Sequence, residues 1–197
     1  MNWTTRDLVL LAVFGALWGG LEMTLGAALK SLNLPLSGVI LAGLGLFIAL
    51  TGRHYVPKPG STFFVGAIAL LLKLFSLGGV IIGPMMAIFM EALLAEIVLS
   101  LWGASGLSFM LAGALGVSWS VVQPFVTGPL LFGRALVDVW TSVIVRAAAI
   151  LHLPPHAVWL VLTAFLAVHM LAGAAVGWFA WRLGPRLHQR SAWGAET

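Results

Sequence analysis

The chain has 197 residues, of which 61% are hydrophobic and only 8% are charged, and its formal net charge is +4. This balance excludes a soluble globular domain and indicates an integral membrane protein. The length suits about six spanning helices of roughly 20 residues, with no room for a soluble catalytic domain. The absence of cysteine excludes disulfides and thiolate chemistry.

The apolar runs predict an all-α integral membrane fold, a six-transmembrane-helix bundle in a single domain over residues 1–197. An extra outer helical insert is expected between the fifth and sixth helices. The helices are predicted at about 7–29, 38–50, 61–77, 79–102, 107–125 and 157–183, and the insert at about 126–156.

The first predicted helix carries a stripe of small residues and one carboxylate. Ala12 and Ala16 are four residues apart and are flanked by Gly15 and Gly19. Small residues in one stripe allow a second helix to approach closely in lipid. The stripe fits packing inside the bundle and docking of a partner about equally well. Glu22 lies further along, in the outer half.

The second predicted helix has no charge and ends at a basic, proline-containing loop, TGRHYVPKPG. Arg53 and Lys58 mark this loop as cytoplasmic by the positive-inside rule. The third predicted helix carries Lys73 near its outer end. For Lys73, snorkelling to the interface competes evenly with a role in a site.

The fourth predicted helix, 79–102, contains two carboxylates, Glu91 and Glu96, in an apolar run. A charged residue at the bilayer centre costs roughly 2.5–3.5 kcal/mol on insertion scales, so such a group needs a cavity, a partner or a ligand. Five residues correspond to roughly 140° around a helix, so the two carboxylates cannot face one small site. We expect Glu91 to face a binding site and Glu96 to make a structural hydrogen bond to a neighbouring helix.

The insert contains Arg134, Asp138 and Arg146, and these charges argue against a seventh span. The first two are four residues apart and favour a surface ion pair over a site. A seventh span would also put the basic C-terminus outside. Six spans place both termini in the cytoplasm, with most basic residues on that side. These inner basic residues are Arg6, Arg53, Lys58, Arg182, Arg186 and Arg190.

Polar residues on different predicted helices converge at similar depth. Glu91 and His169 each lie about 12 residues below the outer end of their helix. At 1.5 Å per residue both are about 18 Å deep, near the midplane, which predicts a shared site. A core histidine remains an equal alternative for His169. The predicted substrate-binding residues are Glu91, His169, Glu22, Lys73, Trp119 and Gln123.

Motifs for catalysis are missing from the sequence. There is no HExxH, GxSxG, aspartate-rich or Walker motif. His152 and His156 are separated by Pro154-Pro155, which breaks the helix that would align them as metal ligands. We expect no enzyme, no metal, no cofactor and no nucleic-acid partner; ATP hydrolysis would need partner subunits.

The chain resembles the substrate-binding S-components of energy-coupling factor (ECF) transporters, most closely the hydroxymethylpyrimidine/thiamine group. The Ala12/Ala16 pair is similar to the patch with which S-components dock on the coupling T subunit. Further matching features are PKPG at 57–60, Gly83-Pro84, AEI at 95–97 and LAGAAVG at 171–177. His169 stands where this group suggests an arginine and Glu91 where it suggests a glutamine, so the substrate stays open.

The resemblance implies a multi-pass protein of a prokaryotic plasma membrane that binds a vitamin or vitamin precursor from outside. It also implies partners, namely one membrane T subunit and two ATPase subunits. The outer insert is longer than this group suggests, and we expect it to act as a lid that orders over the ligand. An anionic Glu91 would suit a cationic or amine-bearing ligand. The alternative is a small membrane scaffold or assembly subunit without a soluble ligand, whose buried charges lock helices together; a membrane enzyme acting on lipid ranks third.

Overall fold

The computed structural model contains helices and no strand in the part of the chain that it describes, which is 2–32, 37–75, 82–133, 135, 138, 141–142, 145 and 158–193. Within these described residues, five helices are long and apolar enough to cross a membrane, and α3 is a shorter apolar helix. The predicted all-α class with several membrane-capable helices is therefore confirmed. The bounds are α1 Thr5–Ser31, α2 Ser37–Tyr55, α3 Ser61–Lys73, α4 Ile82–Trp102, α5 Gly106–Phe132 and α7 Val158–Trp193.

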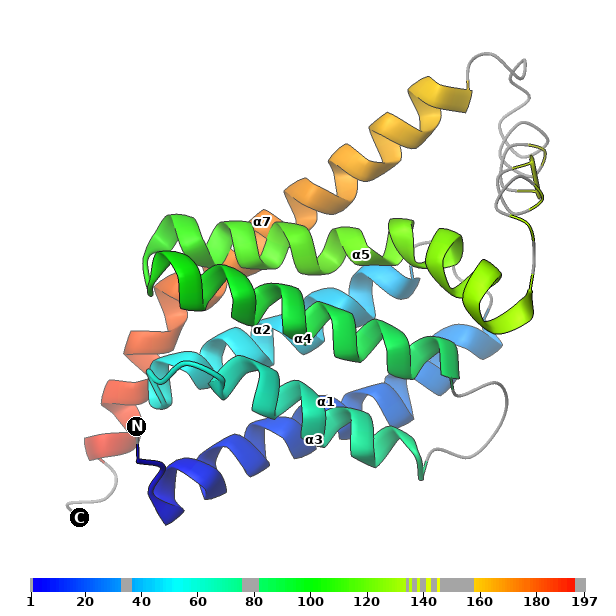
Figure 1. Cartoon of the computed structure of the whole chain (residues 1–197). Helices are drawn as coiled ribbons and strands as arrows, with labels where there is room; N and C mark the ends of the chain where they lie inside the picture. Colours follow the sequence, from blue (N-terminus) through cyan, green and yellow to red (C-terminus); the bar gives the residue numbers. More distant parts are fainter. Residues whose placement is uncertain are drawn as a thin grey trace.

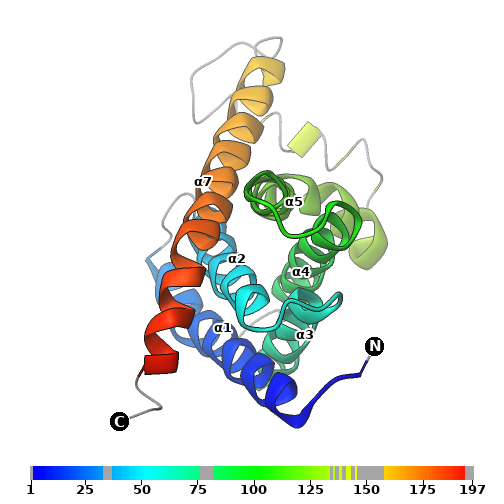
Figure 2. The same cartoon turned by 90° about the vertical axis from the view of Figure 1, so that its left-hand side faces the viewer.

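Helix α2 lies at the centre of the bundle. It contacts each of the other five described helices, and these surround it in the order α1, α3, α4, α5 and α7, as the end view in Figure 2 shows. Two hydrophobic cores meet on α2 and α4: one is shared with α1 and α3, the other with α5 and α7. This central position explains why α2 has no acidic residue and why its one arginine is buried.

Glycines bring helix backbones into direct contact at two places. A Cβ at Gly173 would overlap the backbone of Gly113, and a Cβ at Gly177 would overlap the carbonyl of Phe109, so α5 and α7 touch backbone to backbone. In the other core, the fully buried Trp18 of α1 occupies the space above Gly45 of α2. Small residues thus provide the close approach on which helix association in lipid depends.

The helix ends of α2 and α3 differ from the predicted bounds. Helix α2 continues to Tyr55, because Arg53 and His54 in its last turn complement the helix dipole and the chain turns only before Pro57. Helix α3 ends at Lys73. The N–H groups of the next two residues bond three residues back, a tighter turn that is common at helix ends.

Two helices extend further than predicted. Helix α5 reaches Phe132, so the first seven residues of the expected insert belong to it. It contains Pro124 and Pro129 and bends over its last part, where Figure 1 shows it turning away from its earlier axis. The Thr127 hydroxyl donates to the Gln123 carbonyl (2.9 Å), a local bond of the kind that lets membrane helices tolerate proline. Helix α7 continues beyond its predicted end at residue 183 to Trp193.

Both termini lie at one end of the bundle, together with the α2–α3 and α4–α5 connections (Figure 1). We call this the termini end. Most of the predicted insert, including Arg134 and Arg146, lies outside the described residues. Asp138 is described and exposed.

Candidate functional site

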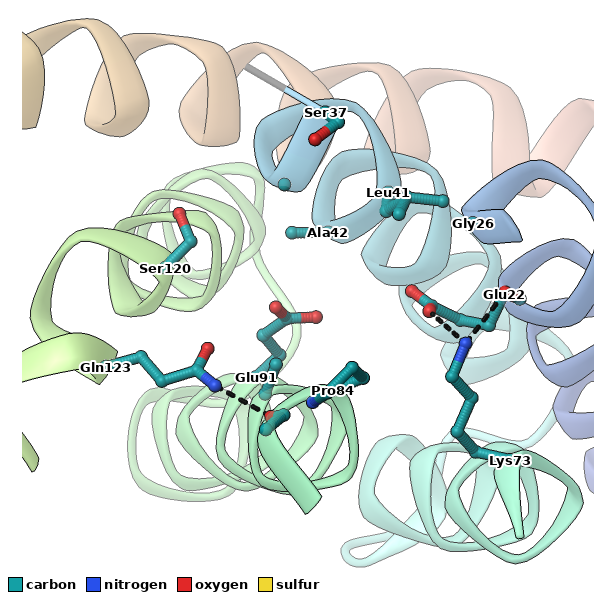
Figure 3. A pocket seen from close by; sticks show the side chains of 13 residues that line it. Glu22, Gly26, Ser37, Leu41, Ala42, Lys73, Pro84, Glu91, Ser120 and Gln123 are labelled. Carbon is teal, nitrogen blue, oxygen red and sulfur yellow. Dashed lines mark hydrogen bonds and ion pairs between the residues drawn. The ribbon is translucent and has the colours of Figure 1, made fainter. Parts of the chain in front are cut away.

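A cavity of about 280 Å³ opens among α1, α2, α3, α4 and α5, in the half of the bundle away from the termini. Figure 3 shows it from close by. Four of the six predicted substrate-binding residues line it, each from a different helix: Glu22, Lys73, Glu91 and Gln123. The remaining lining residues are Gly26, Ser37, Gly38, Leu41, Ala42, Gly83, Pro84, Ala87 and Ser120.

Lys73 turns into the bundle and pairs with α1. Its ammonium donates to the backbone carbonyl of Glu22 at 2.8 Å and lies 3.3 Å from that residue's carboxylate. Only 6% of each residue is exposed, so Lys73 does not snorkel outward. Gly26 makes room beside the pair, because a Cβ there would lie 3.6 Å from the Lys73 nitrogen and 3.6 Å from a Glu22 carboxylate oxygen. The pair is therefore neutral as a unit and forms one wall of the cavity.

Glu91 faces the cavity from α4 without such a partner. It is 3% exposed, and within the described part of the chain its carboxylate has no hydrogen bond or ion pair. In Figure 3 its carboxylate points into the open space between Ser120 and Ala42 on one side and the Glu22–Lys73 pair on the other. A buried carboxylate is costly unless paired, so this group requires a ligand, water or a proton in the cavity.

Gln123 closes the cavity near the start of α4. Its side-chain amide donates to the carbonyl of Gly83 at 2.7 Å, and the neighbouring Pro84 lies in the first turn of α4, where a missing N–H removes no helical bond. Ser120 lies one turn before Gln123 on α5 and lines the same cavity. Sequence reasoning missed Ser120, although its spacing of three residues from Gln123 places both on one helix face.

Glu96, the second carboxylate of α4, serves a structural purpose. It accepts the backbone N–H groups of Gly60 (2.7 Å) and Thr62 (2.9 Å) at the start of α3 and the hydroxyl of Ser100 (2.5 Å). The guanidinium of Arg53 lies 3.5 Å away. A carboxylate at a helix N-terminus satisfies free N–H groups and interacts favourably with the dipole. The predicted structural hydrogen bond to a neighbouring helix is confirmed.

Arg53 ties the same region together. Its guanidinium donates to the Lys58 carbonyl and to the Ser61 hydroxyl (3.0 Å). The left-handed backbone of Gly60, with φ of 93°, brings its N–H to Glu96. The PKPG segment therefore forms a turn held by α2 and α4, which is why it opens α3.

His169 and Trp119 do not line the cavity. His169 is buried on α7, and its ring Nδ1–H donates to the carbonyl of Phe165 one turn earlier (2.7 Å). Trp119 is also buried, and its indole N–H finds no acceptor among the described residues. The structure thus does not bring His169 to Glu91, because among the described helices α7 contacts only α2 and α5, and no described residue that lines the cavity comes from it.

The small residues of α1 fall on two faces. Gly15 and Gly19 meet α3, where a Cβ would press on Ile68 and Leu72 at 2.6 and 2.8 Å. Ala12 and Ala16 are exposed, beside exposed apolar neighbours such as Val13. The two glycines of the stripe therefore pack inside the bundle, whereas its two alanines lie on the surface.

Among the described residues, no group of three or more metal-ligating side chains lies together. The pair His152 and His156 lies outside those residues. Comparisons with family models, with curated proteins and with solved structures found no match to this chain.

Proposed function

We propose that this protein captures a small cationic or amine-bearing molecule, a vitamin or vitamin precursor, as the S-component of an ECF-type importer. The observation that carries the proposal is the Glu91 carboxylate, which is buried, faces a cavity and has no described partner. A cationic ligand would supply the missing charge.

The charges around the cavity favour this ligand class. Lys73 and Glu22 compensate each other at 3.3 Å, so Glu91 determines the sign of the remaining charge. An anionic site with apolar walls attracts cations and repels anions. Ser37, Ser120 and Gln123 add neutral hydrogen-bonding groups around it.

The size of the cavity favours a small ligand. Its volume of about 280 Å³ is near the lower end of small-molecule sites, roughly 300–1,000 Å³. A single-ring aminopyrimidine fits this scale better than a two-ring molecule such as thiamine. Hydroxymethylpyrimidine is therefore our first candidate and thiamine our second.

Helix α1 supports the proposed docking on a T subunit. Ala12 and Ala16 are exposed on a bundle face where α1 has no contact with α7. Small exposed residues allow another membrane helix to approach closely. Arg6, Lys58, Arg182 and Arg186 gather at the termini end, which favours a cytoplasmic location of that end, in the proposed plasma membrane of a prokaryote.

The first experiment is native mass spectrometry of the purified full-length protein, with identification of any released molecule. It is followed by thermal-shift titration with 4-amino-5-hydroxymethyl-2-methylpyrimidine, thiamine and, as an anionic control, pantothenate. We expect one amine-bearing ligand to bind with 1:1 stoichiometry and pantothenate to have no effect. Preferential binding of pantothenate would contradict the role of Glu91.

The alternative is a membrane scaffold without a soluble ligand. The Arg53–Glu96 cluster supports this alternative, because its buried charges join α2, α3 and α4. A protein that is empty after purification and silent towards the whole panel would support the scaffold.

Partner docking has its own test. The chain has no cysteine, so Ala12→Cys gives a single thiol for crosslinking to a T subunit in membranes. Val122→Cys, exposed on α5, is the matched control. Crosslinking from position 12 alone is the expected result.

A further inference from the structure

A second hollow lies on the outside of the bundle, between α2 and α7. It is a groove of about 460 Å³ whose lining residues are all apolar. It shares no lining residue with the Glu91 cavity, which lies on the other side of α2. Helices α2 and α7 pack against each other, and in both views α7 passes obliquely across α2 (Figures 1 and 2). The large side chains along the groove are Ile40, Leu44, Phe47, Val176, Phe179 and Leu183.

The length of the groove matches one leaflet of a bilayer. On α7 its lining runs from Ala172 to Leu183, a distance of eleven residue steps along the helix. At 1.5 Å per residue this is about 16 Å, roughly half of the 30 Å hydrocarbon core. Both flanking helices are long and apolar enough to cross a membrane, and in a bilayer that they span the groove would face acyl chains along this length.

Basic residues stand at one end of the groove. The α7 stripe Ala172, Val176, Phe179 and Leu183 follows helical spacing, and its next position is Arg186. The neighbouring Arg182 is exposed, and its guanidinium lies 5.4 Å from the ring centre of Trp178.

These arginines lie at the termini end, at the level where α2 ends. Gly184, between them, contacts the ring of His54, one residue before the end of α2. When the groove holds an acyl chain, the two arginines therefore lie at the depth of the lipid headgroup.

The arginines have no acidic partner within the described residues. At this end of the bundle, Asp7 is paired with Lys58 and Glu96 with Arg53. Arg182 and Arg186 make neither an ion pair nor a hydrogen bond in the described part of the chain. Guanidinium groups bind phosphate oxygens well, because their N–H groups form a planar fork.

We propose that the α2–α7 groove is a binding site for one anionic phospholipid of the leaflet at the termini end. One acyl chain lies along the groove, and the phosphate lies between Arg182 and Arg186. An apolar partner helix in the groove would leave both arginines without a counter-charge. The site is independent of the small-molecule cavity and would hold if that ligand proposal failed.

The test is native mass spectrometry of the full-length protein with phosphatidylglycerol and phosphatidylcholine carrying identical acyl chains. We expect the wild type to retain one phosphatidylglycerol in preference to phosphatidylcholine. The double variant Arg182→Gln/Arg186→Gln should abolish this preference, because we expect each arginine to contribute about fivefold to it. Arg6→Gln removes a charge from the same end on α1 and should leave the preference unchanged.

The groove itself is tested by filling it. Ala172→Phe should reduce the retained phosphatidylglycerol at least fivefold, whereas Ala167→Phe, exposed on α7 away from the groove, should not. Equal retention of the two lipids by the wild type, or an equal effect of Arg6→Gln and Arg186→Gln, would overturn the proposal. So would displacement of the lipid by a partner membrane helix at equimolar concentration.

Discussion

Glu91 and Glu96 lie on the same helix, five residues apart, and both are more than 90% buried, yet their surroundings are opposite. Glu96 is held by backbone N–H groups of α3, a hydroxyl and a guanidinium. Glu91 faces a cavity and has no described partner. The difference shows that a carboxylate in an apolar helix is not by itself evidence of a binding site. What distinguishes the two is whether the neighbouring helices satisfy the charge.

The largest expected effect comes from removing the charge that the bundle satisfies. Glu96→Gln leaves Arg53 without its counter-charge and makes residue 96 a weaker acceptor for the N–H groups at the start of α3. We therefore expect the free energy of unfolding to fall by about 3 kcal/mol or more. Thermal unfolding in detergent measures it, with Glu91→Gln as the matched control. Equal melting temperatures for the two variants would contradict the comparison.

Glu91→Gln should have the opposite effect to Glu96→Gln, with a loss of ligand affinity and no loss of stability. We expect the affinity for the bound amine to fall tenfold or more, about 1.4 kcal/mol, while the ligand-free protein melts no lower than the wild type. Titration calorimetry and thermal unfolding give the two values. Ser120→Ala removes a neutral lining group and should change affinity about twofold. A stability loss without a binding loss would make Glu91 structural.

The Glu22–Lys73 pair is intermediate, because it is satisfied internally but lines the cavity. A double-mutant cycle of Glu22→Gln and Lys73→Met should give a coupling energy of about 1–2 kcal/mol in stability. Additive effects within about 0.5 kcal/mol would mean that the two residues act independently. In that case Lys73 would also be available to a ligand, and the cavity charge would need revision.

The smallest expected effect is at Gln123. Gln123→Leu removes one hydrogen bond to the Gly83 carbonyl, and we expect a loss of about 1 kcal/mol, visible as a slightly lower melting temperature. Val122→Leu, on the exposed neighbouring position, should have no effect. A loss as large as that of Glu96→Gln would show that the cavity wall, like the α3 cap, stabilises the bundle.

Much of the site could be predicted from the amino-acid sequence. Helix spacing alone separates Glu91 from Glu96, because five residues turn the chain by roughly 140°. Depth counted along each helix puts Glu22, Lys73 and Gln123 in the outer half and Glu91 near the midplane below them, and the structure places all four on one cavity.

Depth alone was insufficient for His169. Its distance from the helix end suggested the level of Glu91, but α7 lies behind α5 and α2, and no residue of α7 lines the cavity. Two residues at the same depth meet only if their helices are neighbours and both side chains point to the space between those helices. That arrangement depends on glycine contacts between α5 and α7. A single sequence does not show which glycines of the two helices meet.

The sequence by itself determined the class of protein, the approximate helices and the positions of the buried charges, since hydropathy and helical period are local properties. Tertiary structure alone decided which charge is satisfied. Lys73 meets Glu22 because α3 packs on α1, and Glu96 caps α3 because α4 lies beside it. Glu91 is left to the cavity because no described side chain of the neighbouring helices pairs with it, and the electrostatic cost of a buried charge depends on its partners in space.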